Sequence, residues 1–150
     1  MSPKDWGPPI WALFHTMAEK VNEADFAKIG PQMFNLIRQI CRNLPCPDCA
    51  NHATTFLNAV KPSSIKTKNE FRLMLWFFHN QVNKRKGYKI YTQEDLAKYA
   101  TYSMLDIYNK FALSYNKKTG NLKLMSDSLE RKRIIVNVSN WFKQNSQSFV

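Results

Sequence analysis

The residues best suited to chemistry are two cysteines, Cys46 and Cys49, which are separated by two residues and flanked by prolines. Two cysteines at this spacing can close a small disulfide ring. Pro47 suits the first position of a helix, where its missing N–H costs no hydrogen bond. Cys46 then falls at or next to the N-cap, where unpaired N–H groups and the helix dipole favour a thiolate. Because the thiolate is the form that attacks disulfides, we expect this pair to carry the chemistry.

A metal site is the alternative use of the same cysteines. A closed zinc site of three cysteines and one histidine could be formed by Cys41, Cys46, Cys49 and His52. Against zinc, Cys41 is expected on the preceding helix, and Pro45 must turn the chain before Cys46. A thioredoxin-like role is disfavoured because no alternation of strands and helices surrounds the pair. We therefore expect no bound metal.

Two further groups place polar and aromatic side chains on helix faces. Trp11 and His15 are four residues apart, so both side chains fall on one side of a helix. Taken alone, they are typical of a buried aromatic ring beside a histidine that bonds to a backbone carbonyl. His79, Asn80 and Asn83 lie next to an apolar stripe and could form hydrogen bonds to something planar and polar. Alone, this second group is a weak signal.

The composition indicates a single helical domain. The chain has 150 residues, of which 44% are hydrophobic and only four are glycine, and this length allows one ordinary core. Three cysteines are too few for a disulfide-dense secreted scaffold. The N-terminal residues lack the apolar core of a signal peptide, and the longest apolar run, 73–78, falls far short of the roughly 20 residues that cross a bilayer. We expect a cytoplasmic protein with no membrane span.

The formal net charge is +11, from 22 basic and 11 acidic residues. Such a charge can attract nucleic acid, anionic membranes or acidic proteins. The basic residues are spread along the chain with no base-reading motif. We therefore expect mostly solvated faces, with a phosphate-bearing ligand as the lesser alternative and no specific nucleic-acid partner.

Helical periodicity and turn residues predict an all-α chain. Gly30 and Pro31 are expected to break the chain between two helices, and Gly87 to end a later one. Thr67 and Glu70 form a capping box before that later helix, and the β-branched run 134–136 could break the last one. The expected helices span residues 9–27, 30–44, 47–59, 68–85, 92–115 and 126–142. They predict a four-helix bundle with additional C-terminal helices.

Taken in order, the three groups resemble the motifs of the flavin-dependent ERV/ALR sulfhydryl oxidases. That family has a G-x-x-x-W-x-x-x-H-T stretch, then P-C-x-x-C-x-x-H/F, then H-N-x-V-N. This chain carries Gly7, Trp11, His15 and Thr16, then Pro45, Cys46, Cys49 and His52, then His79, Asn80, Val82 and Asn83. The resemblance covers about residues 6–91 and looks most like the versions encoded by large cytoplasmic DNA viruses.

The resemblance implies a four-helix bundle that holds FAD and oxidises protein dithiols to disulfides, passing electrons through the flavin to O2 and giving H2O2. By position, Cys49 would be the flavin-proximal cysteine that forms a thiolate–flavin charge-transfer pair. Cys46 would be the outer cysteine, which an incoming substrate thiol attacks. Lys84 or Lys86 would be available to the pyrophosphate. The implied cofactor-binding residues are Gly7, Trp11, His15, Cys49, His52, His79, Asn80, Val82, Asn83, Lys84 and Lys86.

The chain also departs from the family pattern. Leu44 stands where the family often has tyrosine, Met74 where it often has tryptophan, and the run from Lys84 to Tyr88 shifts the lysine. The chain has no second CxC or CxxC pair to pass electrons from substrate. Substrate therefore reaches Cys46 directly or through a separate small redox protein, and we favour the separate shuttle.

Residues 1–91 are expected to form the catalytic core and 92–150 a helical extension packed on the same domain. The extension could cover the bundle, form a homodimer face or dock the redox partner. Cys41 could be a buried small apolar residue, an inter-subunit cysteine or a resolving thiol. Two rival hypotheses stay open: a non-catalytic zinc-stapled module that binds an acidic partner or nucleic acid, and a family member that keeps FAD for structure alone.

Overall fold

The computed structural model describes residues 2–116 and 122–150, and this part of the chain forms helices and turns with no β-strand. The α-helices are α1 (Pro3–Lys20), α2 (Glu23–Arg42), α3 (Pro47–Ala59), α4 (Lys68–Lys86), α5 (Met104–Tyr115) and α6 (Leu122–Gln144). The shorter 3-10 helices are η1 (Pro62–Ser64), η2 (Glu94–Thr101) and η3 (Ser146–Ser148). The all-α prediction is confirmed.

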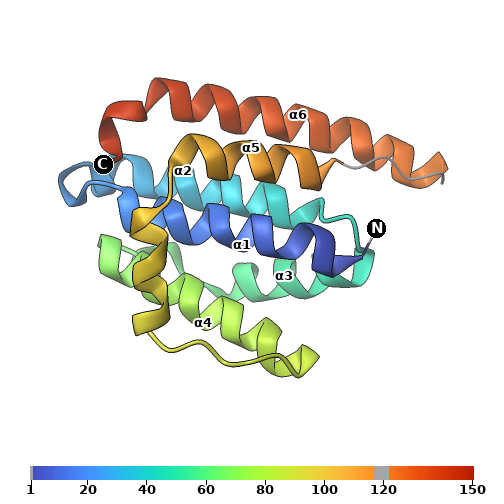
Figure 1. Ribbon diagram of the computed structural model, residues 1–150, viewed down its shortest axis with the longest axis horizontal. Coiled ribbons are helices and arrows are strands. Elements are labelled where there is room, and N and C mark those ends of the chain that lie inside the picture. The colour runs from blue at the N-terminus through green and yellow to red at the C-terminus, as the bar shows by residue number, and fades with distance from the viewer. Residues whose placement is uncertain (1, 117–121) are drawn as a thin grey trace.

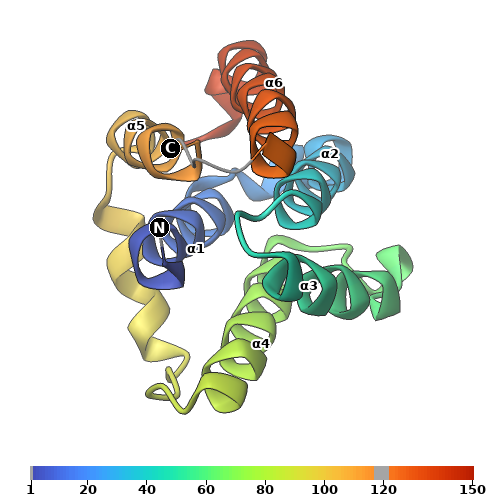
Figure 2. The same ribbon diagram turned by 90° about the vertical axis from the view of Figure 1, so that its right-hand side faces the viewer.

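The α-helices are arranged in layers of two (Figure 1). α1 and α2 make the central layer, with α3 and α4 on one side and α5 and α6 on the other (Figure 2). η2 packs against α1 and connects the side of α4 to α5. The first four helices therefore correspond to the predicted bundle, and the C-terminal helices cover the face of α1 and α2 that α3 and α4 leave open.

One hydrophobic core joins all these layers. Leu13 of α1, Ile37 of α2, Leu75 of α4 and Phe111 of α5 are each completely buried and belong to the same cluster. Full burial of such a side chain contributes roughly 1.5–3 kcal/mol. Val138 of α6 extends the cluster to the last helix. Within the described residues, no helix combines the length and the apolar character needed to cross a membrane.

The first helix begins earlier than expected, at Pro3 rather than at residue 9. The carboxylate of Asp5 accepts a hydrogen bond from the backbone N–H of Ser2 (2.9 Å), which satisfies a donor at the helix start. Pro8 and Pro9 then lie inside α1, where each omits one backbone hydrogen bond. The expected helix start at residue 9 was wrong.

The turn between the first two helices also falls elsewhere. α1 ends at Lys20 rather than near residue 27, because the residues that follow pair with the C-terminal segment. Val21 forms an isolated β-bridge with Phe149, and the backbone N–H of Asn22 donates to the carbonyl of Ser148 (2.7 Å).

Gly30 and Pro31 lie within α2 and do not break it, contrary to the prediction. A Cβ at Gly30 would come within 2.8 Å of the Phe26 ring. The glycine therefore makes room for a buried aromatic ring on its own helix. Its close packing, not chain reversal, accounts for its presence there.

The predicted helix 92–115 is two elements, η2 and α5. Ser103 caps α5, and its side chain accepts from the N–H of Asp106 (3.3 Å). α6 begins at Leu122 and continues through 134–136, so the break considered there does not occur. The stretch 116–121, between the last two expected helices, is polar and was expected to be a loop, and most of it lies outside the described residues.

The boundaries of the two helices nearest the cysteine pair, α3 and α4, agree with the prediction to within one residue. α3 spans the expected residues 47–59. At the start of α4 the capping box is present, since Thr67 and Glu70 each bond the other's backbone N–H at 3.1 Å. Gly87 ends α4 in the left-handed region with a φ of 72°, which a residue with a side chain rarely adopts.

Candidate active site

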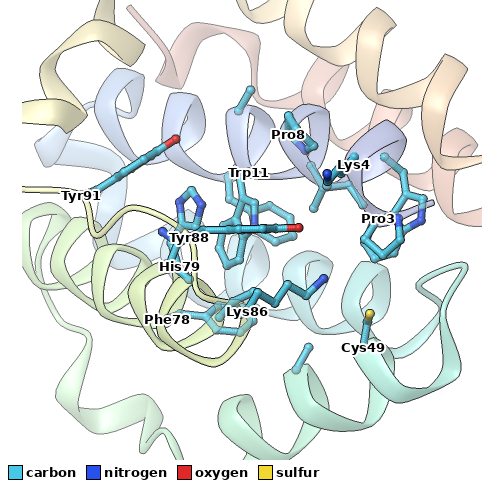
Figure 3. A pocket seen from close by; sticks show the side chains of 18 of the residues that line it. Pro3, Lys4, Pro8, Trp11, Cys49, Phe78, His79, Lys86, Tyr88 and Tyr91 are labelled. Carbon is cyan, nitrogen blue, oxygen red and sulfur yellow. The ribbon is translucent and has the colours of Figure 1, made fainter.

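A cavity of about 630 Å³ lies where α1, the end of α2, the start of α3 and the second half of α4 meet. Its volume is typical of small-molecule and cofactor sites. In Figure 3 the α1 side chains Pro3, Pro8 and Trp11 face Cys49 of α3 across it. Its aromatic lining residues are Trp6, Trp11, Phe14, Phe78, Tyr88, Tyr91, Tyr99 and Tyr102, and its basic ones are Lys4, Arg85, Lys86, Lys89 and Lys98.

The CxxC pair stands at the edge of this cavity. Cys46 is the N-cap of α3, and its Sγ accepts a hydrogen bond from the backbone N–H of Cys49 (3.2 Å). Pro47 is the first residue of α3, as predicted. Both cysteines are partly exposed, but only Cys49 lines the cavity. The helix start thus gives the two sulfurs different surroundings within one turn.

The surroundings of Cys49 favour its protonated form. Burial raises the pKa of the Cys49 thiol to about 11, and the hydrogen bond to Cys46 and the charge of that cysteine act in the same direction. The cations of Lys86 and Arg85 lower the same pKa. A thiolate at Cys49 therefore depends on these two side chains and on whatever fills the cavity.

The zinc set is not assembled. Cys41 lies on the last turn of α2, only 2% exposed, and lines the cavity. Burial raises its pKa well above the ordinary range. His52 is exposed on α3. Over residues 2–116 and 122–150, no three or more His, Cys, Asp or Glu side chains group closely enough to hold a metal ion.

The rings of Trp11, His79 and His15 stack at the cavity, where the two histidines are buried and Trp11 is half-buried. The Trp11 and His79 rings are nearly parallel, with centroids 4.1 Å apart. Nε2 of His15 and Nδ1 of His79 are 2.9 Å apart, so one nitrogen donates a hydrogen bond to the other. His15 also stacks on Tyr99 of η2 (4.8 Å). The histidine predicted to bond to a backbone carbonyl bonds instead to a second histidine.

Both stacked histidines are neutral near pH 7. Burial, followed by the charges of His79 and Lys98, lowers the pKa of His15 from 6.5 to about 3. Burial, followed by Lys98, lowers that of His79 to about 4. A ligand in the cavity therefore meets a neutral imidazole at His79.

Asn80 holds the segment that follows α4. Its side-chain amide donates to the carbonyl of Tyr91, and its oxygen accepts from the N–H of Tyr91, both at 2.9 Å. The indole N–H of Trp76 donates to the same carbonyl (2.9 Å). Tyr91 then lies edge-on to the His79 ring, with centroids 4.7 Å apart. Asn80 thereby positions a cavity wall without lining the cavity.

Among the described residues, the charged side chains that line the cavity are all positive. Five lysine and arginine side chains line the cavity and no aspartate or glutamate does, among the described residues. The ammonium of Lys98 lies over the rings of Tyr91 and Tyr99, at 5.3 and 5.2 Å. Trp6 is 5% exposed, and its indole N–H has no partner in the described part of the chain. Aromatic walls, cations and a free donor suit an anionic ligand with flat rings.

The structure brings most of the predicted site residues together. The cavity is lined by Gly7, Trp11, Cys49, His79, Val82, Asn83 and Lys86. His15 and Asn80 stand behind this lining and contact it. Lys84 and His52 are exposed and do not line the cavity. Of the two lysines considered for an anionic group, Lys86 is the one in place.

The site also includes residues that the sequence analysis did not select. Tyr88, Tyr91, Lys98, Tyr99 and Tyr102 all line the cavity, and three of them lie beyond residue 91. The available signal was the pair of tyrosines and the lysine directly after Gly87, close in sequence to the motif helix. The contribution of η2 to the cavity lining could not be predicted from the sequence, because it depends on how η2 packs against α1.

Comparison with known proteins identifies the family. The model of the Erv1/Alr family matches residues 8–102, more than half of the chain. The chain belongs to the Erv1/Alr family. The matched range contains the CxxC pair and both buried histidines. It ends at the close of η2, so it also includes the cavity residues beyond 91.

Similar proteins include a viral and a plant member. A FAD-linked sulfhydryl oxidase of African swine fever virus (isolate Pig/Kenya/KEN-50/1950) is 32% identical over 85 residues, covering 57% of this chain and 71% of that protein. The FAD-linked sulfhydryl oxidase ERV1 of Arabidopsis thaliana is 27% identical over 94 residues, covering 63% of this chain and 49% of that protein. No solved structure matches the chain.

Proposed function

We propose that this chain is a FAD-linked thiol oxidase, which converts protein dithiols to disulfides and delivers the electrons to O2, giving H2O2. The observation that carries the proposal is the position of Cys49. It lines a cavity of about 630 Å³ with aromatic and basic walls and is hydrogen-bonded through its N–H to the outer Cys46. Membership in the Erv1/Alr family, and relatives named FAD-linked sulfhydryl oxidases, support the same conclusion.

The residues present fit FAD. Trp11 and the neutral ring of His79 offer flat surfaces for an aromatic ring system, and Asn83 lies beside them. Lys86 and Arg85 offer cations to a pyrophosphate. When bound, FAD supplies a two-electron acceptor that O2 can reoxidise. His15 and Asn80 would act from behind, by fixing His79 and Tyr91.

The cysteines divide the thiol chemistry between them. With Cys46 and Cys49 joined as a disulfide, a substrate thiolate attacks Sγ of Cys46, and the electron pair of the broken S–S bond leaves on Sγ of Cys49. Lys86 and Arg85 stabilise the negative charge that Cys49 then carries. The second substrate thiol attacks the mixed disulfide, which releases the substrate disulfide and the Cys46 thiolate. Two electrons have then moved from the substrate to the cysteine pair.

The partner and setting belong to the same proposal. The substrate is a protein dithiol. A small redox shuttle protein passes its electrons to Cys46, because the chain has no second CxC or CxxC pair of its own to do so. The shuttle meets Cys46, the partly exposed cysteine at the start of α3. The expected homodimer and cytoplasmic location also remain predictions.

The test is the visible absorption spectrum of the purified protein before and after dithiothreitol is added in air. We expect an oxidised flavin band near ~450 nm and H2O2 production on addition of the dithiol. A colourless protein with stoichiometric zinc would overturn the proposal in favour of the zinc-stapled module. A flavin band without peroxide production would overturn the oxidase and leave a structural cofactor.

A further inference from the structure

The last turn of α2, just before the CxxC pair, is bound by two buried side chains from the C-terminal helices. The hydroxyl of Tyr115 on α5 donates to the carbonyl of Ile40 (2.8 Å). The guanidinium of Arg131 on α6 donates through Nη1 to the carbonyl of Asn43 (3.5 Å). Tyr115 is 0% and Arg131 1% exposed. Two separate helices thus hold one short stretch of backbone.

These contacts lie where the chain enters the redox pair. Asn43 is the C-cap of α2, and its backbone N–H also donates to the carbonyl of Ile40 (3.2 Å), so both bound carbonyls belong to this helix end. Only Leu44 and Pro45 separate Asn43 from Cys46, the N-cap of α3. The backbone of α3 packs mainly against α2, and Figure 2 shows α2 between α6 and α3. The end of α2 therefore determines where the start of α3 lies.

We propose that Tyr115 and Arg131 are positioning residues through which the C-terminal helices set the thiol–disulfide equilibrium of Cys46 and Cys49. This inference rests on the proposed redox function of that pair. A fixed end of α2 keeps Sγ of Cys46 within hydrogen-bond reach of the Cys49 N–H. That bond stabilises the reduced pair, and a stabilised reduced form makes a disulfide easier to reduce. Loosening the end of α2 shifts the equilibrium toward the disulfide.

A substitution of Arg131 can distinguish a positioning role from a contribution to stability alone. Its Nε and Nη2 atoms are buried with no hydrogen-bond partner in the described part of the chain. Burying a charge without a full set of partners costs free energy, so an apolar side chain of similar volume at this position need not destabilise the fold. If Arg131 served stability alone, Arg131→Met would leave the cysteine equilibrium unchanged. If it positions the pair, the same variant changes that equilibrium without any loss of thermal stability.

The experiment compares Tyr115→Phe and Arg131→Met with the matched control Tyr108→Phe. Tyr108 also lies on α5, and its hydroxyl donates to the carbonyl of Ile135 (3.1 Å) on α6, so the control removes the same atom from a bond that does not involve α2. Each protein is equilibrated with reduced and oxidised dithiothreitol in the absence of O2, so that the proposed oxidase activity cannot consume the dithiol. One disulfide and one dithiol then exchange two electrons and two protons. Free thiols are then trapped by alkylation. Trypsin cleaves after Arg38 and Arg42, so Cys41 is read on a different peptide from the redox pair.

We expect Tyr115→Phe and Arg131→Met each to shift the equilibrium at least about threefold toward the disulfide, while Tyr108→Phe matches the wild type. Arg131→Met keeps a Tm at or above that of the wild type. Equal equilibria in all four proteins overturn the inference, and so does an equal shift in Tyr108→Phe. The equilibrium is measured on the cysteines themselves. A failure here therefore leaves the flavin spectrum and the peroxide assay untouched, and a failure of those assays does not alter this result.

Discussion

Cys41 and Cys49 border the same cavity from opposite kinds of helix end. Cys49 lies in the first turn of α3, where a backbone N–H reaches the sulfur of its neighbour Cys46 (3.2 Å). Cys41 lies in the last turn of α2, where the backbone presents carbonyl oxygens, and it is only 2% exposed. Burial raises both pKa values, but only Cys49 has cations that lower its own. We infer that the helix end and the nearby cations, not the shared cavity, make Cys49 the more reactive of the two sulfurs.

The largest test of this contrast is to remove each sulfur in turn. We expect Cys49→Ser to keep its flavin and to lose dithiol turnover by about a thousandfold or more, because the leaving sulfur is gone. Cys41→Ser should stay within about twofold of the wild type, since a buried thiol takes no part in the exchange. Both are measured as peroxide production with dithiothreitol. Full turnover by Cys49→Ser would place the redox chemistry elsewhere.

Alkylation of the native reduced protein measures the same contrast without substitution. We expect iodoacetamide to modify Cys46 and Cys49 at least about 100-fold faster than Cys41, because a buried thiol must wait for local unfolding. Mass spectrometry of the tryptic peptides gives each rate. Denaturant should remove the difference, which is the control. Comparable rates in the native protein would show that Cys41 is accessible.

A third test asks whether the cavity wall formed by Tyr91 affects flavin binding without affecting the cysteine pair. Asn80→Ala deletes two hydrogen bonds to the backbone of Tyr91. We expect flavin affinity to fall about tenfold, the effect of roughly 1.4 kcal/mol. The alkylation rate of Cys46 should be unchanged, because Cys46 does not line the cavity that Tyr91 borders. Flavin titration into the apoprotein measures the first quantity, and an unchanged affinity would argue against a role for Tyr91 in binding.

The last test concerns acid and the stability of the fold rather than activity. His15 and His79 have folded pKa values of about 3 and about 4, below the ordinary 6.5. Between pH 6.5 and 4 the unfolded chain binds more protons, so their contribution to stability is complete above pH 6.5 and is lost as the pH falls. The free energy of unfolding should decline by up to about 1.4 kcal/mol per pH unit for each histidine.

Denaturant titrations across this range measure the acid effect. His15→Gln should flatten the decline, because one buried imidazole no longer takes up a proton on unfolding. The control is His52→Gln, which changes the remaining, exposed histidine of the chain and should leave the slope as it is. A slope that His15→Gln does not alter would assign the acid sensitivity to the carboxylates.

The motif residues were predictable because their chemistry depends on local spacing. Pro47 starts a helix wherever the rest of the chain lies, so Cys46 at the N-cap followed from four residues of sequence. The family prediction rested on three such local groups in order and is confirmed by the match over residues 8–102. The individual cofactor contacts of these residues stay predictions, although most of them line one cavity.

The errors fell where distant parts of the chain decide local structure. The turn at Val21 is held by Phe149, a residue 128 positions away (149 − 21), and no local pattern predicts such a pairing. Gly30 was taken as a break because glycine usually is one, whereas here it accommodates the Phe26 ring. The division between η2 and α5 could have been found, since Ser103 and Asp106 form a recognisable helix start.

The lining that carries five cations and no carboxylate among the described residues has a consequence for the amount of folded protein. Without an anion, these like charges repel one another, and a bound anion reduces that repulsion. Any ligand that binds only the folded state adds RT ln(1 + [L]/Kd) to its stability. The level of active protein in a cell should therefore follow the supply of that ligand, so that a shortage of cofactor removes the protein as well as its activity.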